Sequence, residues 1–241
     1  MDDQEVTEYY HRGVVCHLIG QDLAIPLDVE FQRPGEGEVP AAKRLLERVF
    51  ANYPRYFDAV VGDGLYFEAP FINFCREQHK HVIVVVKGDH RLLLQDAQGL
   101  FAQRAGDGQW TEGRRTVQYW DDEGFTSSEG VSEPLRVLHT EETERRRERI
   151  AGQWVNTEQT SSWYWATTFS SRQLPARSFW RAGHWRYRHR ERLLQQHLDP
   201  LGPGSCFQAR TDGDRQFRAH AVSCLCPPAM LLATEPQAAL S

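Results

Sequence analysis

The sequence contains few cysteines and no long apolar run, and each absence excludes a class of protein. Five cysteines occur among 241 residues, an odd number without paired spacing, which favours a reduced protein over a disulfide framework. Cys224 and Cys226 form a lone C-x-C, too little to indicate a metal site. No stretch approaches the roughly 18 consecutive apolar residues of a membrane-spanning helix, and the acidic start MDDQE does not resemble a signal peptide. We therefore expect a cytoplasmic protein that makes no membrane contact.

Common enzyme motifs are also missing. The chain has no Gly-rich phosphate loop of either common form and no G-x-S-x-G, so an α/β nucleotide-binding or hydrolase domain lacks its expected features. The net charge of −5 does not suggest a nucleic-acid binder. Residues 172–192, however, hold seven arginines and one acid, Glu191, interleaved with aromatic residues. That composition suits contact with phosphates and bases, although a solvated protein face would look similar.

Hydrophobic periodicity predicts an α/β fold with a mixed sheet. Strands are expected over residues 9–20 and 23–31, joined as an antiparallel hairpin, and a helix with one apolar stripe is expected to begin near Pro40. A strand ending at Asp63, a helix over 68–78 and a valine strand over 82–86 come next, and the helical crossover predicts that these two strands are parallel. A further helix is expected over 92–101.

Residues 105–169 are predicted to be rich in β-structure. Short apolar segments are separated by polar turns, and they lie at Trp110 and at residues 117–120, 135–138 and 163–168. Between them, residues 141–149 include eight charged residues out of nine. We expect this charged segment to be a solvated hairpin loop or an exposed helix.

Asp63 occupies the position around which the remaining features are arranged. A short apolar run ends at this carboxylate, which two glycines flank (AVVGDGLY, residues 59–66). Open α/β sheets place their active sites beyond the carboxyl ends of such buried strands. An Asp that caps a helix at a strand–helix turn is the simpler alternative.

Several motifs together resemble the DDE transposases of bacterial insertion sequences. The resemblance rests on YYHR (9–12), PGEGE (34–38), AAKRLL (41–46), VGDGLY (61–66), VVVKG (84–88), WDDEGF (120–125) and WYWATT (163–168). It implies an RNase H-like core with a β-rich insertion. The expected domains are 1–104 (partial core), 105–169 (insertion), 170–186 (return to the core) and 187–241 (an out-of-frame or poorly ordered tail). It also implies that the partner is DNA, namely the terminal inverted repeats of an insertion sequence. The resemblance allows a homodimer of this chain to bind that DNA. Lys87, Arg172, Arg177, Arg181 and Arg186 are the residues we expect to contact it.

The chemistry of this family requires three converging acids. Two metal ions, Mg²⁺ or alternatively Mn²⁺, activate the attacking oxygen and stabilise the leaving oxygen of a phosphodiester, and carboxylates hold them. The resemblance makes Asp63 the second acid, and therefore a catalytic residue and metal ligand. The first should lie further upstream of residues 9–12 than this chain reaches, so we expect a chain truncated at its start. Arg186 matches the basic position of the final motif, and Gly183 stands where the family often has Tyr.

The third acid should come after residues 183–186 on a helix that the family begins with Ile-Glu-Asn, whereas this chain reads YRHRER. Codons read from the second base of Tyr187 can spell Ile-Asp-Ile-Glu-Asn-Asp. The same shift over the codons of residues 201–210 permits a sequence that fits the C-terminal helix of the family, and over residues 215–225 it permits an apolar helix. We therefore expect residues 187–241 to be translated out of frame and poorly ordered. The resulting hypotheses are a transposase made inactive by the loss of two acids, or a non-catalytic remnant that still binds DNA.

Overall fold

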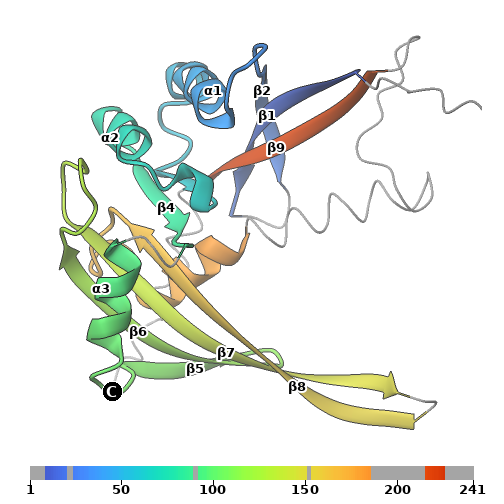
Figure 1. Cartoon of the computed structure of the whole chain (residues 1–241), viewed down its shortest axis with the longest axis vertical. Helices are drawn as coiled ribbons and strands as arrows, with labels where there is room; N and C mark the ends of the chain where they lie inside the picture. The colour runs from blue at the N-terminus through green and yellow to red at the C-terminus, as the bar shows by residue number, and fades with distance from the viewer. Residues whose placement is uncertain (1–8, 21–23, 89–91, 151–152, 186–214, 226–241) are drawn as a thin grey trace, which may run out of the picture. The chain divides into compact units, whose positions relative to one another are not determined.

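The computed structural model describes residues 9–20, 24–88, 92–150, 153–185 and 215–225 (Figure 1). The chain divides into two compact units. Unit 1 comprises the chain up to Gly62, residues 78–80 and the chain from His184 onward, and unit 2 comprises Asp63–Glu77 and His81–Gly183. Each unit has its own strands and helices.

Unit 1 contains a sheet in the order β2-β1-β9-β3. Strands β1 (Tyr9–Ile19) and β2 (Ile25–Phe31) form an antiparallel hairpin, as predicted. Strand β9 (Arg215–Leu225) pairs parallel to β1 and antiparallel to β3 (Ala59–Gly62). The sheet is therefore mixed, and the predicted α/β fold with a mixed sheet is confirmed.

Helix α1 (Glu38–Asn52) packs on β1 and β2 through the predicted apolar stripe. Its residues Leu45, Leu46 and Val49 are completely buried, and Pro40 lies in the first turn, where a missing backbone donor is harmless. Arg44 and Arg48 on another face form ion pairs with acids of β2 and of the following loop. Hydrogen bonds from Arg44 lower the pKa of Glu36 to about 2.

Unit 2 contains a sheet in the order β4-β8-β7-β6-β5, in which each pairing is antiparallel. Its strands are β4 (His81–Val85), β5 (Gly108–Glu112), β6 (Arg115–Phe125), β7 (Leu135–Ile150) and β8 (Gln153–Thr167). Its helices are η1 (Gly64–Tyr66), α2 (Ala69–Glu77) and α3 (Leu92–Phe101). Residues 176–185 are also helical, and all of them up to Gly183 belong to unit 2. The parallel pairing predicted for β3 and β4 would join the two units and stays a prediction, as do the domain boundaries drawn from the sequence.

The expectation for residues 141–149 was wrong. These residues continue strand β7, which pairs with β8 without interruption from Arg136 opposite Thr167 to Ile150 opposite Gln153. Most of the described side chains of residues 141–149 are exposed or half-buried, and the one that is buried, Glu142, is charged, so the alternation of apolar and polar residues that identifies strands is missing. Cross-strand pairs such as Arg145 with Glu158, 3.0 Å apart, contribute to the ladder instead.

The predicted poorly ordered tail, residues 187–241, is described only at β9. There the chain forms an eleven-residue strand between β1 and β3, which differs from the expectation for these residues. A segment without helical periodicity can pair with strands whose backbone N–H and C=O groups are not yet hydrogen-bonded to a neighbouring strand. The rest of the tail and Arg186 lie outside the described residues.

An aromatic cluster in unit 2 holds a histidine that should make stability depend on pH. His139 stacks on Tyr164 and Trp120, with ring centroids 4.1 and 4.9 Å away, and burial lowers the pKa of its imidazole below the ordinary 6.5. The unfolded chain therefore takes up this proton at a higher pH than the folded chain does. Its contribution to stability is complete above about pH 6.5 and is lost as the pH falls toward the folded pKa.

We expect His139→Phe to reduce the loss of stability between pH 7 and pH 5. The measurement is the free energy of unfolding in urea at several pH values for both proteins. His79→Asn, at an exposed position with φ 57° where Asn is tolerated, is the control and should keep the slope of the parent chain. Equal slopes for the parent chain and His139→Phe would contradict the prediction.

Candidate functional site

Asp63 stands where the sequence predicts it, directly after a strand whose four residues are all buried. Its Oδ1 accepts a hydrogen bond from the backbone N–H of Leu65 at 3.0 Å and so caps the short helix η1. The capping alternative is therefore confirmed as an interaction of this side chain. A carboxylate has about four lone-pair positions, so one capping hydrogen bond is compatible with metal ligation. The catalytic and metal-binding roles of Asp63 stay predictions.

The turn after Asp63 lies against the end of β4. A Cβ atom built on Gly64 would be 3.3 Å from the carbonyl oxygen of Val85 and 3.4 Å from the Cβ of Lys87. A side chain at position 64 would therefore make a tight contact with the backbone at the end of β4, which glycine avoids. Lys87 is exposed, and its Nζ lies 6.0 Å from the ring centroid of Trp163. The end of β4 therefore presents a cation beside the turn that carries the candidate carboxylate.

The described residues do not make a two-metal site. Strands β1, β3, β4 and β9 contain no Asp or Glu, so none of them adds an acid to Asp63. Across the described part of the chain, no group of three or more His, Cys, Asp and Glu is placed to hold a metal ion. A two-metal centre for phosphodiester chemistry needs several carboxylates, and one cannot position both ions.

The arginines predicted to contact DNA have different surroundings. Arg172 is exposed. Arg177 and Arg181 both pair with Glu112 of β5, through closest contacts of 3.4 and 2.9 Å. Glu112 therefore balances part of the charge on this helix, and the sequence gives no sign of that pairing because 65 residues separate it from Arg177.

Gly183 has no room for a side chain. A Cβ at this position would lie 2.6 Å from Nε1 and 3.0 Å from Cδ1 of Trp165, a residue that is completely buried. The indole of Trp165 therefore occupies the space that a Tyr at position 183 would enter. This departure from the family pattern is accommodated by packing, and sequence reasoning alone did not connect the two residues.

Two buried charges that sequence reasoning missed hold the segment around helix 176–185 to the sheet. Arg136, with 2% exposure, donates to both oxygens of Asp121 and to the carbonyl oxygen of Leu174. Glu142, also 2% exposed, accepts a 2.8 Å hydrogen bond from Nε1 of Trp180. Charged residues in a sequence carry no signal of burial, so only the strand register reveals these contacts.

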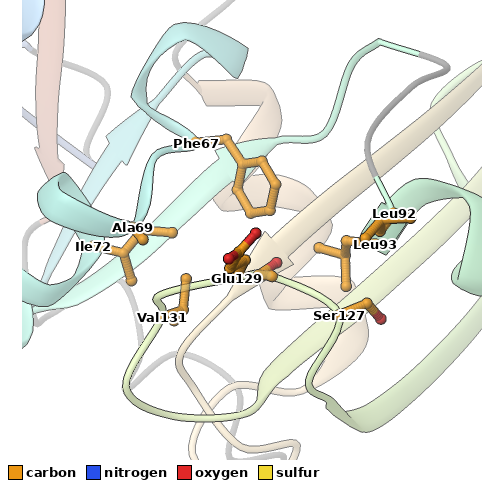
Figure 2. Close-up of a pocket in the computed structure, with 9 residues that line it drawn as sticks. Phe67, Ala69, Ile72, Leu92, Leu93, Ser127, Glu129 and Val131 are labelled. Atoms are coloured by element: carbon orange, nitrogen blue, oxygen red, sulfur yellow. The ribbon is translucent and has the colours of Figure 1, made fainter.

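A cavity of about 220 Å³ opens within unit 2 (Figure 2). Mainly apolar side chains from α2, α3 and neighbouring loops line it, and the carboxylate of Glu129 points toward the ring of Phe67. The hydroxyl of Ser128 is buried there, and it has no hydrogen-bond partner among the described residues. None of the predicted site residues lines this cavity.

Comparison with known families identifies the family to which this chain is similar. A family model described as Transposase DDE domain matches residues 4–190, which include Asp63, Lys87 and the arginines up to position 186. No curated protein matches the chain. Among the described residues, no helix is long and apolar enough to cross a membrane.

Proposed function

The chain belongs to the transposase DDE domain family, and we propose that it is an insertion-sequence transposase that binds DNA but does not cleave it in this form. The family match carries the proposal, because it covers most of the chain and supports a role in DNA transposition. The mixed α/β fold is consistent with the RNase H-like core of this family. We further propose that the DNA is the terminal inverted repeats, that two copies bind it, and that the protein is cytoplasmic.

Asp63 is the one residue that we assign to the family's catalytic triad. Its place after a buried strand and its fixed turn support that assignment. The proposed loss of cleavage rests on its neighbours, because the adjoining strands of its sheet supply no second carboxylate and the segment after Arg186 departs from the family pattern. Mg²⁺ or Mn²⁺ is the cofactor of the intact site, and one carboxylate does not position two ions.

DNA contact is assigned to Lys87, Arg172, Arg177, Arg181 and Arg186. Lys87 and Arg172 are exposed, and Arg177 and Arg181 keep 48% and 41% of their side-chain surface exposed despite pairing with Glu112. Exposed ion pairs contribute little to stability, so these arginines can exchange Glu112 for phosphate at small cost.

Residues 187–241 are proposed to be translated out of frame. This proposal requires A as the third base of the codons for Arg188 and Arg190, because only then does the shifted frame encode the acidic residues of the family's helix. Sequencing of the coding DNA tests this directly. Another base at either position would overturn the frame proposal without affecting family membership.

Strand cleavage and DNA binding can be measured separately with the full chain. We expect a labelled duplex that carries the terminal repeats flanking the coding DNA to bind, and expect no nicking across a titration of Mg²⁺ or Mn²⁺. Metal-dependent nicking that Asp63→Asn abolishes would show an active enzyme and overturn the proposed inactivity. Asp58→Asn, in the exposed residue before β3, is the matched control. Absence of binding would overturn the DNA-binding function itself.

A further inference from the structure

The β7–β8 hairpin extends beyond the rest of its sheet. Strand β6 pairs with β7 only as far as Arg115 opposite Glu144, after which β7 and β8 form six further pairs with each other. We call residues 145–150 and 153–158 the hairpin arm. At about 3.4 Å per residue, the arm is roughly 20 Å long. Figure 1 shows β7 and β8 running on past the ends of β5 and β6.

One face of the hairpin arm combines arginines with an amide and an indole. Arg145, Arg147 and Arg149 alternate along β7, and their cross-strand partners are Glu158, Asn156 and Trp154. Side chains two residues apart share a face of a strand, and so do directly opposed pairs. The arm thus displays three arginines in a row, about 7 Å apart.

The side chains of this face are open to solvent. Arg145 has 81% of its side-chain surface exposed, and Trp154 is 61% exposed, an unusual position for so large an apolar ring. The guanidinium carbon of Arg147 lies 5.5 Å from the ring centroid of Trp154, within the range of a cation–π contact. An exposed aromatic ring beside exposed arginines suits contact with nucleic acid, because the ring can stack on a base while the arginines neutralise phosphates.

We propose that the hairpin arm enters the major groove of DNA, an inference that rests on the proposed DNA-binding function. The major groove, about 12 Å wide, admits a two-stranded β-ribbon. The arm carries four arginines and two glutamates in a chain of net charge −5, so the positive charge is local. Arg and Asn are side chains that hydrogen-bond base edges, and arginines at the same time neutralise phosphates.

The ion pair within the arm does not oppose this role. Arg145 and Glu158 lie 3.0 Å apart, but both side chains are more than half exposed, so the pair contributes little to stability. Its arginine can exchange the carboxylate for a phosphate. A second protein chain is a different occupant of the same arm, and the test separates it from DNA.

The experiment uses the full chain and a labelled duplex that carries the terminal repeats, with affinity measured by fluorescence anisotropy at several salt concentrations. We expect R147Q/R149Q to raise Kd by about 10- to 100-fold and to reduce the slope of log K against log salt by about 2. Arg33→Gln with Arg55→Gln, at two exposed sites outside the arm, makes the same charge change and is the control. Methylation of guanine N7 should interfere with binding by the parent chain and lose that effect in R147Q/R149Q.

Four results would overturn the proposal. An R147Q/R149Q protein that binds with the affinity and salt slope of the parent chain would remove the arm from the interface while leaving the DNA-binding function intact. If the control pair weakens DNA binding as much as R147Q/R149Q does, the loss of affinity comes from the change in net charge and not from the arm. A dimer of the parent chain that R147Q/R149Q dissociates, at unchanged DNA affinity, would assign the arm to protein contact. If the parent chain binds no duplex, the proposed function fails together with the arm.

Discussion

Replacement of Asp121 by Ala is expected to lower the free energy of unfolding by about 3–5 kcal/mol. Arg136 donates from Nε and Nη2 to the two oxygens of Asp121 at 2.7 and 2.6 Å, and its guanidinium carbon lies 5.4 Å from the ring centroid of Phe179. Since Arg136 is only 2% exposed, removal of the carboxylate leaves a buried positive charge with one neutral acceptor, the carbonyl oxygen of Leu174. The loss is costly because water does not solvate the buried guanidinium, and the electrostatic attraction of Glu123 does not replace the two lost hydrogen bonds.

The neighbouring Asp122 offers a matched control. It pairs with Arg104 at 3.0 Å, but both side chains are about one third exposed, so Asp122→Ala should cost less than about 1 kcal/mol. Urea unfolding followed by tryptophan fluorescence measures both variants. The double change D121L/R136M removes both charges and should recover part of the loss. A cost for Asp121→Ala no larger than that of Asp122→Ala would contradict the assigned role of the buried pair.

Elements with a clear hydrophobic period could be predicted from the sequence. The stripe of α1 places four apolar residues on one face of a helix, and the structure buries all of them. Helix α3 spans Leu92–Phe101, the range that the sequence predicts. The hairpin of β1 and β2 is expected from two apolar runs with a short polar connection. In each case burial of one face decides both the pattern and the structure.

Charged segments could not be predicted in the same way. Within β7, Glu142 is buried and Glu141 is exposed, although the two residues are identical in type and adjacent in the chain. Arg136 is buried while Arg145 is almost fully exposed. The difference comes from partners distant in sequence, which a local pattern cannot contain. The hairpin arm could not be recognised from the sequence for this reason.

The position of the candidate site could be predicted from the sequence, but the contacts that surround it could not. A buried strand that ends in Asp63 can be read from the sequence, and so can a cation near the end of the next strand, Lys87. The capping hydrogen bond to Leu65 and the close approach at Gly64 depend on backbone geometry. The pairing of Arg177 and Arg181 with Glu112 depends on tertiary packing and was not foreseen.

Replacement of Glu142 by Ala is expected to cost about 3 kcal/mol of unfolding free energy, because it leaves a buried donor without its acceptor. Oε1 of Glu142 accepts from Nε1 of Trp180 at 2.8 Å, and Oε2 accepts from Arg115 at 3.0 Å. Trp180, 1% exposed, belongs to helix 176–185, so this carboxylate ties the helix that presents Arg177 and Arg181 to strand β7.

Two further variants separate the hydrogen bond from the charge of Glu142. Glu142→Gln keeps an amide oxygen that can accept from Trp180 and loses only the charge toward Arg115, so we expect a smaller cost of about 1 kcal/mol. Glu141→Ala, at the exposed position next to it, should change stability by less than about 0.5 kcal/mol. Urea unfolding measures all three, and near-ultraviolet circular dichroism reports the packing of Trp180. Equal costs for Glu142→Ala and Glu141→Ala would contradict an anchoring role, since an exposed and a buried carboxylate would then be equivalent.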